Sequence, residues 1–501
     1  MNNRLTHILA AIVALALRSA HARDVIIPPT GDWAAAVNAL KPGDVALLQQ
    51  GRYKYGPTIT VRGTESAPVI IRGQGRRESA IDGRGKSGTA LTLRACTNLV
   101  IENVLITNPS RYGIDGTTTW DHMKNKKKYP KKKGLNEGLV VRDCARVTIR
   151  HCRFDDIGTR GILAGNTDRL RIEQNLFFKI GNDTASGDVA LGGRTRRWTI
   201  RGNLFAGNVD GVVCDGAGAE GLIERNLFVF HKWEDAIDLK VVYKKKDEDP
   251  WNTIRYNIIY ADQTHFSGIT LQDGTQCVRV YYNVIHGMTG TKRKPGAGRG
   301  LMLQSRARRI GKDVCKDYFI VGNWFDAFDH PGEGTAIVSF RNSKKPAPLQ
   351  NVWILHNVIS GFKHAVELRY GDNVNVFNNI FADCSPHVKI KAKAAGNLYR
   401  NTEPWDADSA PITEDPTRGA APAPGKPEAA GPGNGKAAAV DGLDWDCGRD
   451  VGIPKTIRID GQTYTFEDWD SLEASIFRKL AGHFSHDELK KCLAIGRRPI
   501  P

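Results

Sequence analysis

The sequence predicts an all-β protein wound into a right-handed parallel β-helix, and three observations support this. Asn followed by two apolar residues recurs along the chain, with most copies 22 to 34 residues apart. Most copies follow a stretch such as VTIRHC or LRIEQN, in which inward and outward residues alternate at period two. No helical period of comparable length appears in this region. Short repeats made of strand and turn are typical of coils that stack on one another.

The recurring asparagine is expected to form a ladder inside one turn of the coil, where side-chain amides bond between neighbouring coils. Asn175, Asn203 and Asn226 are predicted to stack in this way. The copies are Asn103, Asn175, Asn203, Asn226, Asn257, Asn283, Asn323, Asn357 and Asn379, with Cys152 as a variant. A leucine-rich repeat consensus is missing, and a propeller would need longer, four-stranded blades.

Composition divides the chain into four parts. Residues 1–22 combine Arg4, a short apolar run and an Ala-His-Ala cleavage site, which indicates a secretory signal peptide. Residues 23–402 are assigned to the β-helix, with GDWAAAVNAL as a short helix that caps its N-terminal end. Residues 403–443 have the Ala, Pro and Gly content of a linker, and residues 444–501 form a small tail with one short helix.

The formal charge of +17 predicts an anionic partner, and nucleic acid, acidic membrane and acidic polysaccharide all satisfy this condition. Export favours an acidic polysaccharide and makes nucleic acid an unlikely partner. The apolar run near the N-terminus is too short to span a bilayer, and no later segment approaches the required length. We therefore expect a monomer without a membrane span, secreted or periplasmic, that meets an extracellular polyanion.

Cysteines and lysines are less informative. Most of the nine cysteines fall at apolar strand positions, such as Cys152 and Cys214, where small core residues are expected rather than a disulfide framework. Cys447 and Cys492 in the tail could pair with each other or stay free. The seven lysines within residues 124–133 interrupt a coil as a loop, either solvated or in contact with a substrate.

The stretch HKWEDAIDLKVVY, residues 231–243, belongs to a second recurring strand. Aligning its copies by apolar alternation places one residue of each inside the coil. These inward residues are Ile162, Val189, Val212, Ile237, Ile269, Leu301 and Val366. Asp238 and Lys240 then share the outward face, because strand side chains repeat with period two.

A cluster of carboxylates is expected beside this strand. Asp210 precedes the strand of the previous coil, and Glu234, Asp235 and Asp238 follow one coil later. Neighbouring coils are about 4.8 Å apart, so these charges repel one another unless a cation neutralises them. An oxygen-rich, flexible set of this kind suits Ca²⁺ better than Mg²⁺. A solvated turn with ordinary surface ion pairs is the alternative.

Lys240 suggests a chemistry for this cluster. Uronate polymers are cleaved when a base removes the proton at C5, α to the carboxylate, and the 4-linked sugar leaves. A bound Ca²⁺ makes that proton more acidic as a Lewis acid, and an amine whose pKa is lowered by neighbouring positive charge can act as the base. Lys240 is the candidate base, and its alternative role is an ion pair with Asp215 one coil away.

The chain resembles the parallel β-helix polysaccharide lyases over residues 25–400, in its capping helix, KPGDVALLQQGRY, APVIIRGQG and WEDAIDLK. Its four acidic residues are similar to the Ca²⁺ site of the pectate lyases of family nine, which implies that they bind the ion. The catalytic lysine of that family stands on the following coil, where this chain has Thr270 or Gln272.

The chain also resembles the chondroitinase-B and alginate lyase branch, where an acidic residue stands five positions before the catalytic lysine, as Asp235 stands before Lys240. That branch has an arginine on the next coil, and here TLQDG puts Gln272 in its place. We therefore expect Lys240 as the base and Arg306 as a substitute acid or a clamp on the substrate carboxylate. Gln272 and His265 are the expected substrate-binding residues.

Other functions fit part of the pattern. A β-helix pectin hydrolase would carry a GHG motif, which is missing. A uronate C5-epimerase shares the proton abstraction, but its D-P-H-D signature is not found. A non-catalytic carbohydrate-binding or adhesin β-helix would keep the ladder and the charge without the Ca²⁺ and lysine pair. The sequence thus predicts a secreted polysaccharide lyase that cleaves a uronate-containing polysaccharide by Ca²⁺-assisted β-elimination, with the last two functions as alternatives.

Overall fold

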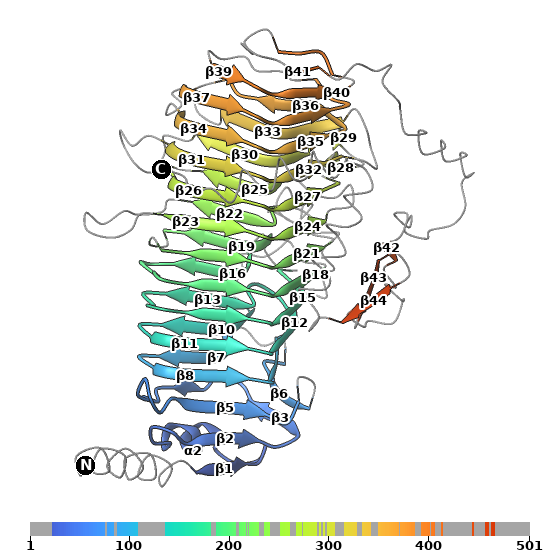
Figure 1. The fold of residues 1–501 in the computed structure, drawn as a ribbon. Coiled ribbons are helices and arrows are strands. Elements are labelled where there is room, and N and C mark those ends of the chain that lie inside the picture. Colours follow the sequence, from blue (N-terminus) through green and yellow to red (C-terminus); the bar gives the residue numbers. More distant parts are fainter. Residues whose placement is uncertain are drawn as a thin grey trace, which may run out of the picture. The chain divides into compact units, whose positions relative to one another are not determined.

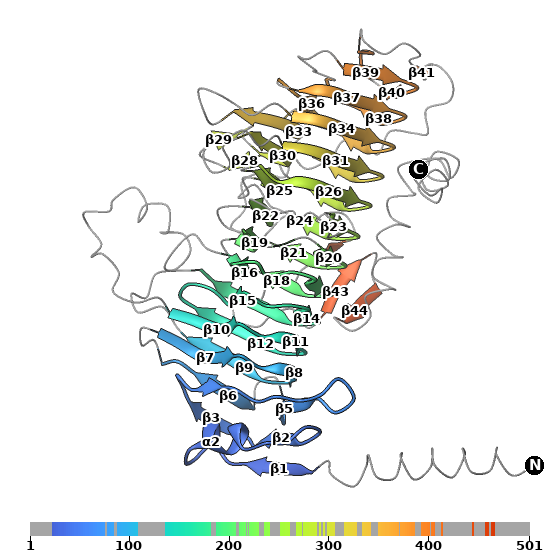
Figure 2. The same cartoon turned by 90° about the vertical axis from the view of Figure 1, so that its left-hand side faces the viewer.

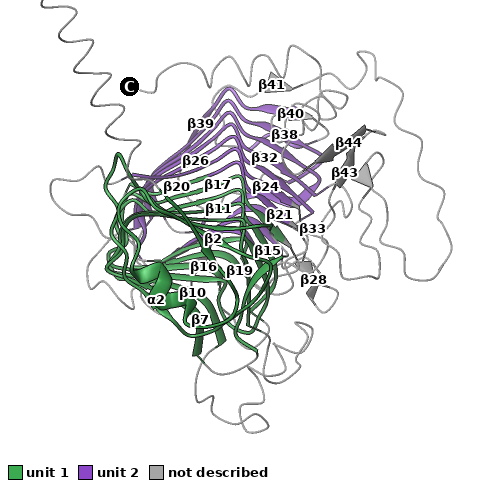
Figure 3. Ribbon diagram, turned by 90° about the horizontal axis from the view of Figure 1, so that it is seen from below, with its two compact units in different colours: residues 1–223, 231–250 green, residues 224–230, 251–501 purple. Residues whose placement is uncertain are grey.

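The structure is a computed structural model, and almost all of its described residues lie in strands and the turns between them. It divides into two compact units, residues 1–223 with 231–250 and residues 224–230 with 251–501 (Figure 3). The structure describes residues 23–75, 78–84, 88–108, 136–181, 187–206, 210–216, 218, 220–229, 235–240, 251–260, 267–272, 274–287, 290–291, 294–295, 298–305, 315–327, 333–341, 349–369, 371–385, 392–400, 402–405, 412–413, 443–444, 456–459 and 462–465.

Coils of the first unit contribute strands to three parallel sheets, which we call A, B and C (Figures 1 and 2). Sheet A contains β1 (Asp24–Ile27), β2 (Val45–Leu48), β5 (Val69–Gly73), β8 (Thr97–Glu102), β11 (Ala145–Arg150), β14 (Arg171–Glu173), β17 (Thr199–Arg201) and, at the division between the units, β20 (Leu222–Glu224). Sheet B contains β3 (Gly51–Lys54), β6 (Ser79–Asp82), β9 (Leu105–Asn108), β12 (Arg153–Ile157), β15 (Leu176–Ile180) and β18 (Leu204–Ala206). Sheet C contains β4 (Thr58–Ile59), β7 (Gly88–Arg94), β10 (Asn136–Arg142), β13 (Ile162–Gly165), β16 (Gly187–Gly192), β19 (Asp210–Asp215) and β22 (Ile237–Lys240).

The second unit repeats the three-sheet plan. Its sheet A strands are β23 (Asn252–Arg255), β26 (Gln276–Tyr281), β31 (Cys315–Val321), β34 (Leu349–Leu355), β37 (Asp372–Phe377) and β39 (Ala392–Ala395). Its sheet B strands are β21 (Leu227–Val229), β24 (Ile258–Tyr260), β27 (Val284–His286), β32 (Trp324–Asp326), β35 (Val358–Ser360), β38 (Ile380–Ala382), β40 (Leu398–Arg400) and β41 (Ile412–Thr413). Its sheet C strands are β25 (Ser267–Gln272), β30 (Arg299–Ser305), β33 (Glu333–Arg341) and β36 (Phe362–Glu367). The parallel β-helix predicted from the repeats is therefore confirmed.

Short elements lie outside the three sheets. The helix expected within GDWAAAVNAL is present as α2 (Trp33–Asn38), and the Asp32 carboxylate caps it by accepting from the Ala35 backbone N–H. Antiparallel pairs join β28 (Gly290–Thr291) to β29 (Lys294–Pro295), and β43 (Thr456–Ile459) to β42 (Leu443–Asp444) and β44 (Gln462–Thr465). The proposed signal peptide and the predicted tail helix lie outside the described residues.

The asparagine ladder is present in the first unit and follows from a tight turn between sheets A and B. The residue before each ladder position has a positive φ, such as 53° at Gln174 and 61° at Gly202. Asn175 donates from Nδ2 to Oδ1 of Asn203 over 3.1 Å, and its backbone N–H donates to the same oxygen over 2.9 Å. Asn203 in turn donates from Nδ2 to the Ile172 carbonyl. Both side chains are fully buried, so the amides satisfy backbone groups that water cannot reach.

A longer ladder begins at Asn226 in the second unit. Each Nδ2 donates to the next Oδ1 over 2.9–3.0 Å. The members are Asn226, Asn257, Asn283, Asn323, Asn357, Asn379 and Asn397, all fully buried. The sequence analysis did not include Asn397, although Leu398 and Tyr399 follow it as Leu176 and Phe177 follow Asn175.

One ladder assignment is wrong and one is confirmed. Asn103 itself takes the positive φ, 56°, and Val104 occupies the ladder position: the Arg153 N–H donates to the Val104 carbonyl as the Leu204 N–H donates to that of Asn175. Asparagine tolerates the left-handed conformation, which is why the motif appears one residue early there. Cys152 does occupy the ladder position, since its backbone N–H donates to Asn175 Oδ1 over 2.9 Å.

The predicted inward column of sheet C is confirmed within each unit. Val189 pairs with Ile162 and Val212, and Val212 pairs with Ile237; all four side chains are fully buried. In the second unit the prediction placed Val366 directly after Leu301, but β33 lies between them and supplies Ile337. Its neighbours Ala336 and Val338 are also apolar and buried, so this strand lacks the alternation on which the alignment depended.

Cysteines are core residues, as expected. The seven cysteines in the described part of the chain are free thiols, and all except Cys384 are buried. Cys447 and Cys492 lie outside the described residues.

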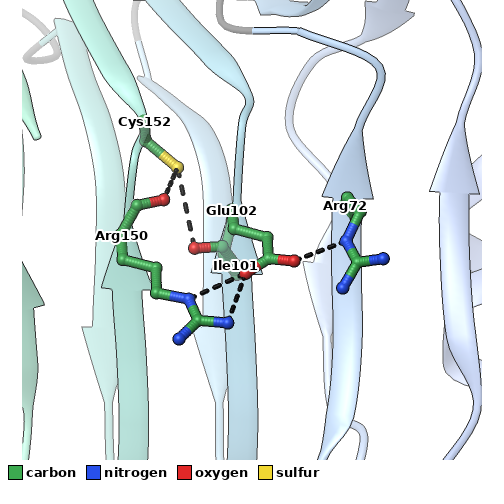
Figure 4. A network of polar contacts seen from close by, with 5 residues as sticks. All are labelled: Arg72, Ile101, Glu102, Arg150 and Cys152. Carbon is green, nitrogen blue, oxygen red and sulfur yellow. Dashed lines mark hydrogen bonds and ion pairs between the residues drawn. The ribbon is translucent and has the colours of Figure 1, made fainter. Parts of the chain in front are cut away.

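Sheet A of the first unit carries ion pairs between coils (Figure 4). Glu102 on β8 accepts from Arg72 Nε on β5 over 2.5 Å and from Arg150 Nε on β11 over 2.7 Å. Burial acts to raise the pKa of the Glu102 carboxyl, but the hydrogen bonds and charges of the two arginines outweigh it, so this pKa is lowered. One carboxylate thus joins three successive coils.

We predict that Asn203→Ala lowers the free energy of unfolding by about 1–3 kcal/mol, because the backbone N–H of Asn175 and the Ile172 carbonyl lose a buried partner. Chemical denaturation would measure the change. Thr199→Ala, at a half-buried position on the same coil, is the control and should change stability much less. Equal effects of the two substitutions would contradict a structural role for the ladder.

We predict that Glu102→Gln lowers the melting temperature at neutral pH, by the equivalent of about 1 kcal/mol or less because both arginines are partly exposed. The folded pKa of Glu102 is depressed, so its contribution is present above the unfolded pKa and is lost as the pH falls through the folded pKa. The difference between variant and parent should therefore disappear in acid. A difference that persists in strong acid would show that packing, not charge, is responsible.

Candidate functional site

Asp238 and Lys240 lie on the outward side of sheet C in the first unit, as predicted. Val213 pairs with Asp238 and Asp215 with Lys240, while the intervening Leu239 is fully buried in the core. The site is more enclosed than the alternation alone implies, because Asp238 is only 3% exposed. This carboxylate is therefore not an ordinary surface charge.

The Lys240 ammonium is paired with Asp238. Its Nζ lies 2.6 Å from Asp238 Oδ2, and the lysine side chain is 24% exposed against 4% for the aspartate. The ion pair is formed within one strand, between residues two apart on the same face. Lys240 does not need Asp215 as the partner that the surface ion-pair interpretation assigned to it.

Asp210 and Asp235 stand together at the start of the same two strands. The Asp235 backbone N–H donates to Asp210 Oδ1 over 3.1 Å, and the Gly211 N–H donates to the Asp235 carbonyl over 3.2 Å. Both aspartates are buried, with 4% and 7% exposure. The expected juxtaposition of Asp210 with the turn one coil later is therefore present.

The charge of these aspartates acts on Lys240. Burial lowers the pKa of the lysine, but the charge and hydrogen bond of Asp238, followed by the charges of Asp210 and Asp235, outweigh burial and hold this pKa well above its ordinary value. This differs from the expectation of an amine whose pKa is lowered by positive neighbours. The reason is that the nearest neighbours of Lys240 are anionic, so the chain alone keeps it protonated.

The described residues fit part of a calcium site. Their donor atoms are carboxylate oxygens, which suit a hard divalent cation, and three buried aspartates face a single ammonium. Yet among the residues that the structure describes, no group of three or more His, Cys, Asp or Glu is arranged to hold a metal ion. Asp210 and Asp235 are the adjacent pair, Asp238 is engaged by Lys240, and Glu234 lies outside the described residues.

The other predicted residues belong to the second unit or lie outside the described residues. Gln272 lies on β25 of the second unit, where it is buried and in register with Gln304. His265 and Arg306 lie outside the described residues. The structure therefore assembles Asp210, Asp235, Asp238 and Lys240 and leaves the roles of the other residues as predictions.

Asp188 on β16 is a buried acid that the sequence analysis did not select. Gly187 pairs with Asp210, so Asp188 stands beside Gly211 on the neighbouring coil, and its side chain is fully buried. The signal that could have found it is the recurrence of an aspartate at the start of three consecutive sheet C strands, at Asp188, Asp210 and Asp235.

Comparison with known proteins agrees on the fold. Residues 137–308 match the family model described as a right handed beta helix region, which covers coils of both units. A search of curated proteins finds no match. No helix in the part of the chain that the structure describes is long and apolar enough to cross a membrane.

Solved structures with a similar backbone act on several carbohydrates. The chain is similar to an alginate lyase from Paenibacillus sp. str. FPU-7, with 14% identity and a TM-score of 0.41 over 66% of this chain and 98% of that one. It is similar to a mannuronic acid specific polysaccharide family 6 lyase from human gut microbiota, with 14% identity and a TM-score of 0.41 over 72% and 87%. It is also similar to DFA-IIIase from Arthrobacter chlorophenolicus A6, with 12% identity and a TM-score of 0.44 over 79% and 95%. These similarities concern the backbone, and function must be inferred from the site residues.

We predict that Asp238→Asn lowers the pKa of Lys240, because Asp238 is the carboxylate that most raises it. The measurement is the pH dependence of Lys240 acylation, read by peptide mass spectrometry, which should shift to lower pH in the variant. Glu173→Gln removes a carboxylate from sheet A and is the control. An unshifted acylation profile in Asp238→Asn would contradict the ion pair.

Proposed function

We propose that the protein is an exported polysaccharide lyase that cleaves a uronate-containing polysaccharide by β-elimination, with Ca²⁺ as its cofactor. The observation that carries this proposal is the position of Lys240. Its amine lies 2.6 Å from Asp238, and the charges of Asp210 and Asp235 also raise its pKa. An amine beside buried carboxylates combines a group that exchanges a proton with a place where a cation can bind.

The proposed reaction uses Lys240 as the base. Its neutral amine takes the C5 proton of a uronate residue, the C5–H electron pair forms the C4–C5 double bond, and the C4–O bond breaks toward the departing sugar. One product ends in an unsaturated uronate. The other product keeps the oxygen of the broken bond, which becomes a hydroxyl group when it gains a proton. We propose Arg306 as the group that protonates or orients this side of the substrate, with Gln272 and His265 in contact with the sugar.

The protonation state of Lys240 is the obstacle that the site must overcome. With Asp210, Asp235 and Asp238 all ionised, the amine keeps its proton and cannot accept another. A divalent cation bound by Asp210, Asp235 and Asp238, with Glu234, would neutralise the charges that raise this pKa and would also acidify the C5 proton of a bound uronate. Because Asp238 raises this pKa most, its binding to the cation would be the step that allows Lys240 to lose its proton.

The same observation supports a second candidate, a non-catalytic protein that binds acidic carbohydrate. A lysine that stays protonated can hold a substrate carboxylate as an ammonium ion without taking part in a reaction. The raised pKa of Lys240 favours this role as long as the aspartates are not neutralised. The two candidates differ in whether a product forms.

We predict that the protein releases unsaturated uronate ends from at least one of polygalacturonate, alginate, chondroitin and dermatan, measured by ultraviolet absorbance. Lys240→Ala should lower the rate by about a hundredfold or more, as expected for a missing base. Lys179→Ala, which removes a lysine from sheet B, is the control and should leave the rate unchanged. Lys240→Ala with nearly full turnover would exclude Lys240 as the base.

Chelation tests the requirement for Ca²⁺ independently of the rest of the proposal. Activity should fall after exhaustive chelation and return with Ca²⁺. Binding of acidic polymer without any unsaturated product, with or without Ca²⁺, would favour the non-catalytic candidate.

A further inference from the structure

A single outward column of sheet C connects Lys240 to two arginines. Arg94 on β7 is in register with Arg142 on β10, and Arg142 with Gly165 on β13. The column then continues through Gly192 and Asp215 to Lys240. We call the residues Arg94, Arg142, Gly165, Gly192, Asp215 and Lys240 the outward column.

Arg94 and Arg142 form an unusual pair. They are in register on adjacent coils, both are exposed, and like charges placed opposite each other on neighbouring strands destabilise a sheet. Neither guanidinium makes an ion pair within the described part of the chain. The charge of Arg142 reaches Glu137 and helps to lower its pKa, although burial of Glu137 has the larger, opposite effect. The Glu137 carboxylate itself is hydrogen-bonded to Arg160 over 2.8 Å.

Arginines on sheet A of the same unit, by contrast, are paired with carboxylates. Arg72 and Arg150 lie two coils apart with Glu102 between them, and both donate to that carboxylate (Figure 4). Arg171 is likewise paired with Glu173, at 2.8 Å. Arg72, Arg150 and Arg171 on sheet A are thus each paired with a carboxylate. Arg94 and Arg142 need a counter-charge from outside the described residues.

Between the arginines and Lys240, the described positions of the outward column include two glycines, Gly165 and Gly192. A Cβ placed on Gly165 would meet only the Gly192 carbonyl, at 4.0 Å. The neighbouring outward positions are apolar: Leu163 and Val213 are half-buried, and Ala190 is buried. A pyranose ring can lie against such a surface through its apolar face, and its carboxylate can extend to either side.

We propose that the outward column is an extended binding site for a carboxylated polysaccharide, in which Arg142 and Arg94 bind uronate carboxylates remote from the point of cleavage. This inference rests on the proposed function, because it takes Lys240 as the end where the reaction occurs. Arg142 stands four coils from Lys240, about 19 Å, and Arg94 stands five coils away, about 24 Å. Coils are spaced about as closely as successive hexose rings in an extended polymer, so only an oligosaccharide of several residues can bridge the two ends.

Charge along the column determines where carboxylates bind. Asp215 is exposed and lies next to Lys240 in register. It therefore repels an anion that contacts the outward surface at this coil. The carboxylates therefore bind at the arginine end and at Lys240, with Gly165 and Gly192 between them. Arginine suits this role because its planar fork binds a carboxylate through two parallel hydrogen bonds. Arg94 and Arg142 are positioning residues, and they should affect KM rather than kcat.

The test is the affinity of oligouronates for the combined variant Arg94→Gln, Arg142→Gln, measured by calorimetry with Lys240 intact and a chelator present so that nothing is cleaved. We expect an octasaccharide to bind at least about tenfold more weakly and a disaccharide to bind as before. The control, Arg52→Gln with Arg171→Gln, removes the same charge from sheets B and A and should leave both affinities unchanged. Equal affinities in variant and control, or an equal loss for both ligand lengths, would overturn the proposal.

A second variant tests whether the polymer lies across Gly165, independently of the arginine charges. Gly165→Leu is sterically permitted, since its Cβ has room, and it places a side chain across the column. It should weaken the octasaccharide and leave the melting temperature and the disaccharide affinity unchanged; an unchanged octasaccharide affinity in a folded Gly165→Leu protein would count against the path.

The outcomes separate this inference from the proposed function. Loss of octasaccharide binding in the arginine variant, in a protein that forms no unsaturated product, would support the binding site and refute the lyase. Cleavage of a polymer with KM unchanged in the arginine variant, made with Lys240 intact, would refute the binding site and leave the lyase standing. No binding of any carboxylated octasaccharide, or tighter binding of a sulfated octasaccharide that lacks uronate, would overturn the assignment to uronate.

Discussion

Register between stacked coils is the constraint on which the rest of the structure depends. Each strand pairs in parallel with the strand one coil away, so a residue has its counterpart about 4.8 Å above or below it. A slip by one residue would turn every inward side chain outward. The buried asparagines oppose such a slip, because Asn175 donates both its side-chain and its backbone N–H groups to Asn203. Unpaired, these groups would be costly in the dry interior.

Stacking in register also brings the charged side chains of successive coils close together. On sheet A opposite charges alternate, since Glu102 lies between Arg72 and Arg150. On sheet C the like charges have no such partner between them: Asp235 donates its backbone N–H to the Asp210 carboxylate, and Arg94 is in register with Arg142. Like charges in contact destabilise a fold unless something outside the chain neutralises them. The two faces of one unit therefore differ in a property that is best explained by binding, with a cation expected at the acidic end and an anion at the basic end.

Lys240 connects these two requirements. Its pKa is raised by the aspartates around it, so its role as a base depends on neutralising them, whereas its role as a binding group does not. A site of this kind is inactive toward C5 protons until its cation is present and retains affinity for carboxylates throughout. Under the proposed function, a cation and the substrate would be coupled through this single amine, and Leu163, Ala190 and Val213 between Lys240 and the arginines would give the substrate an apolar surface on which to lie.

The sequence by itself determined the fold class, the ladder and the inward column of sheet C, because period-two alternation and a repeated asparagine are local signals. It also identified Asp210 and Asp235, which lie at matching places in consecutive repeats, and Asp238 and Lys240 on the strand that follows Asp235. Only the tertiary structure decided that Val104 replaces Asn103 in the ladder, that β33 supplies an extra coil, that Asp238 rather than Asp215 holds Lys240, and that Arg94 stacks on Arg142. The physical reason is the variable length of the turns: strands keep their period, but the number of residues between coils changes, so which side chains become neighbours is settled only when the coils pair.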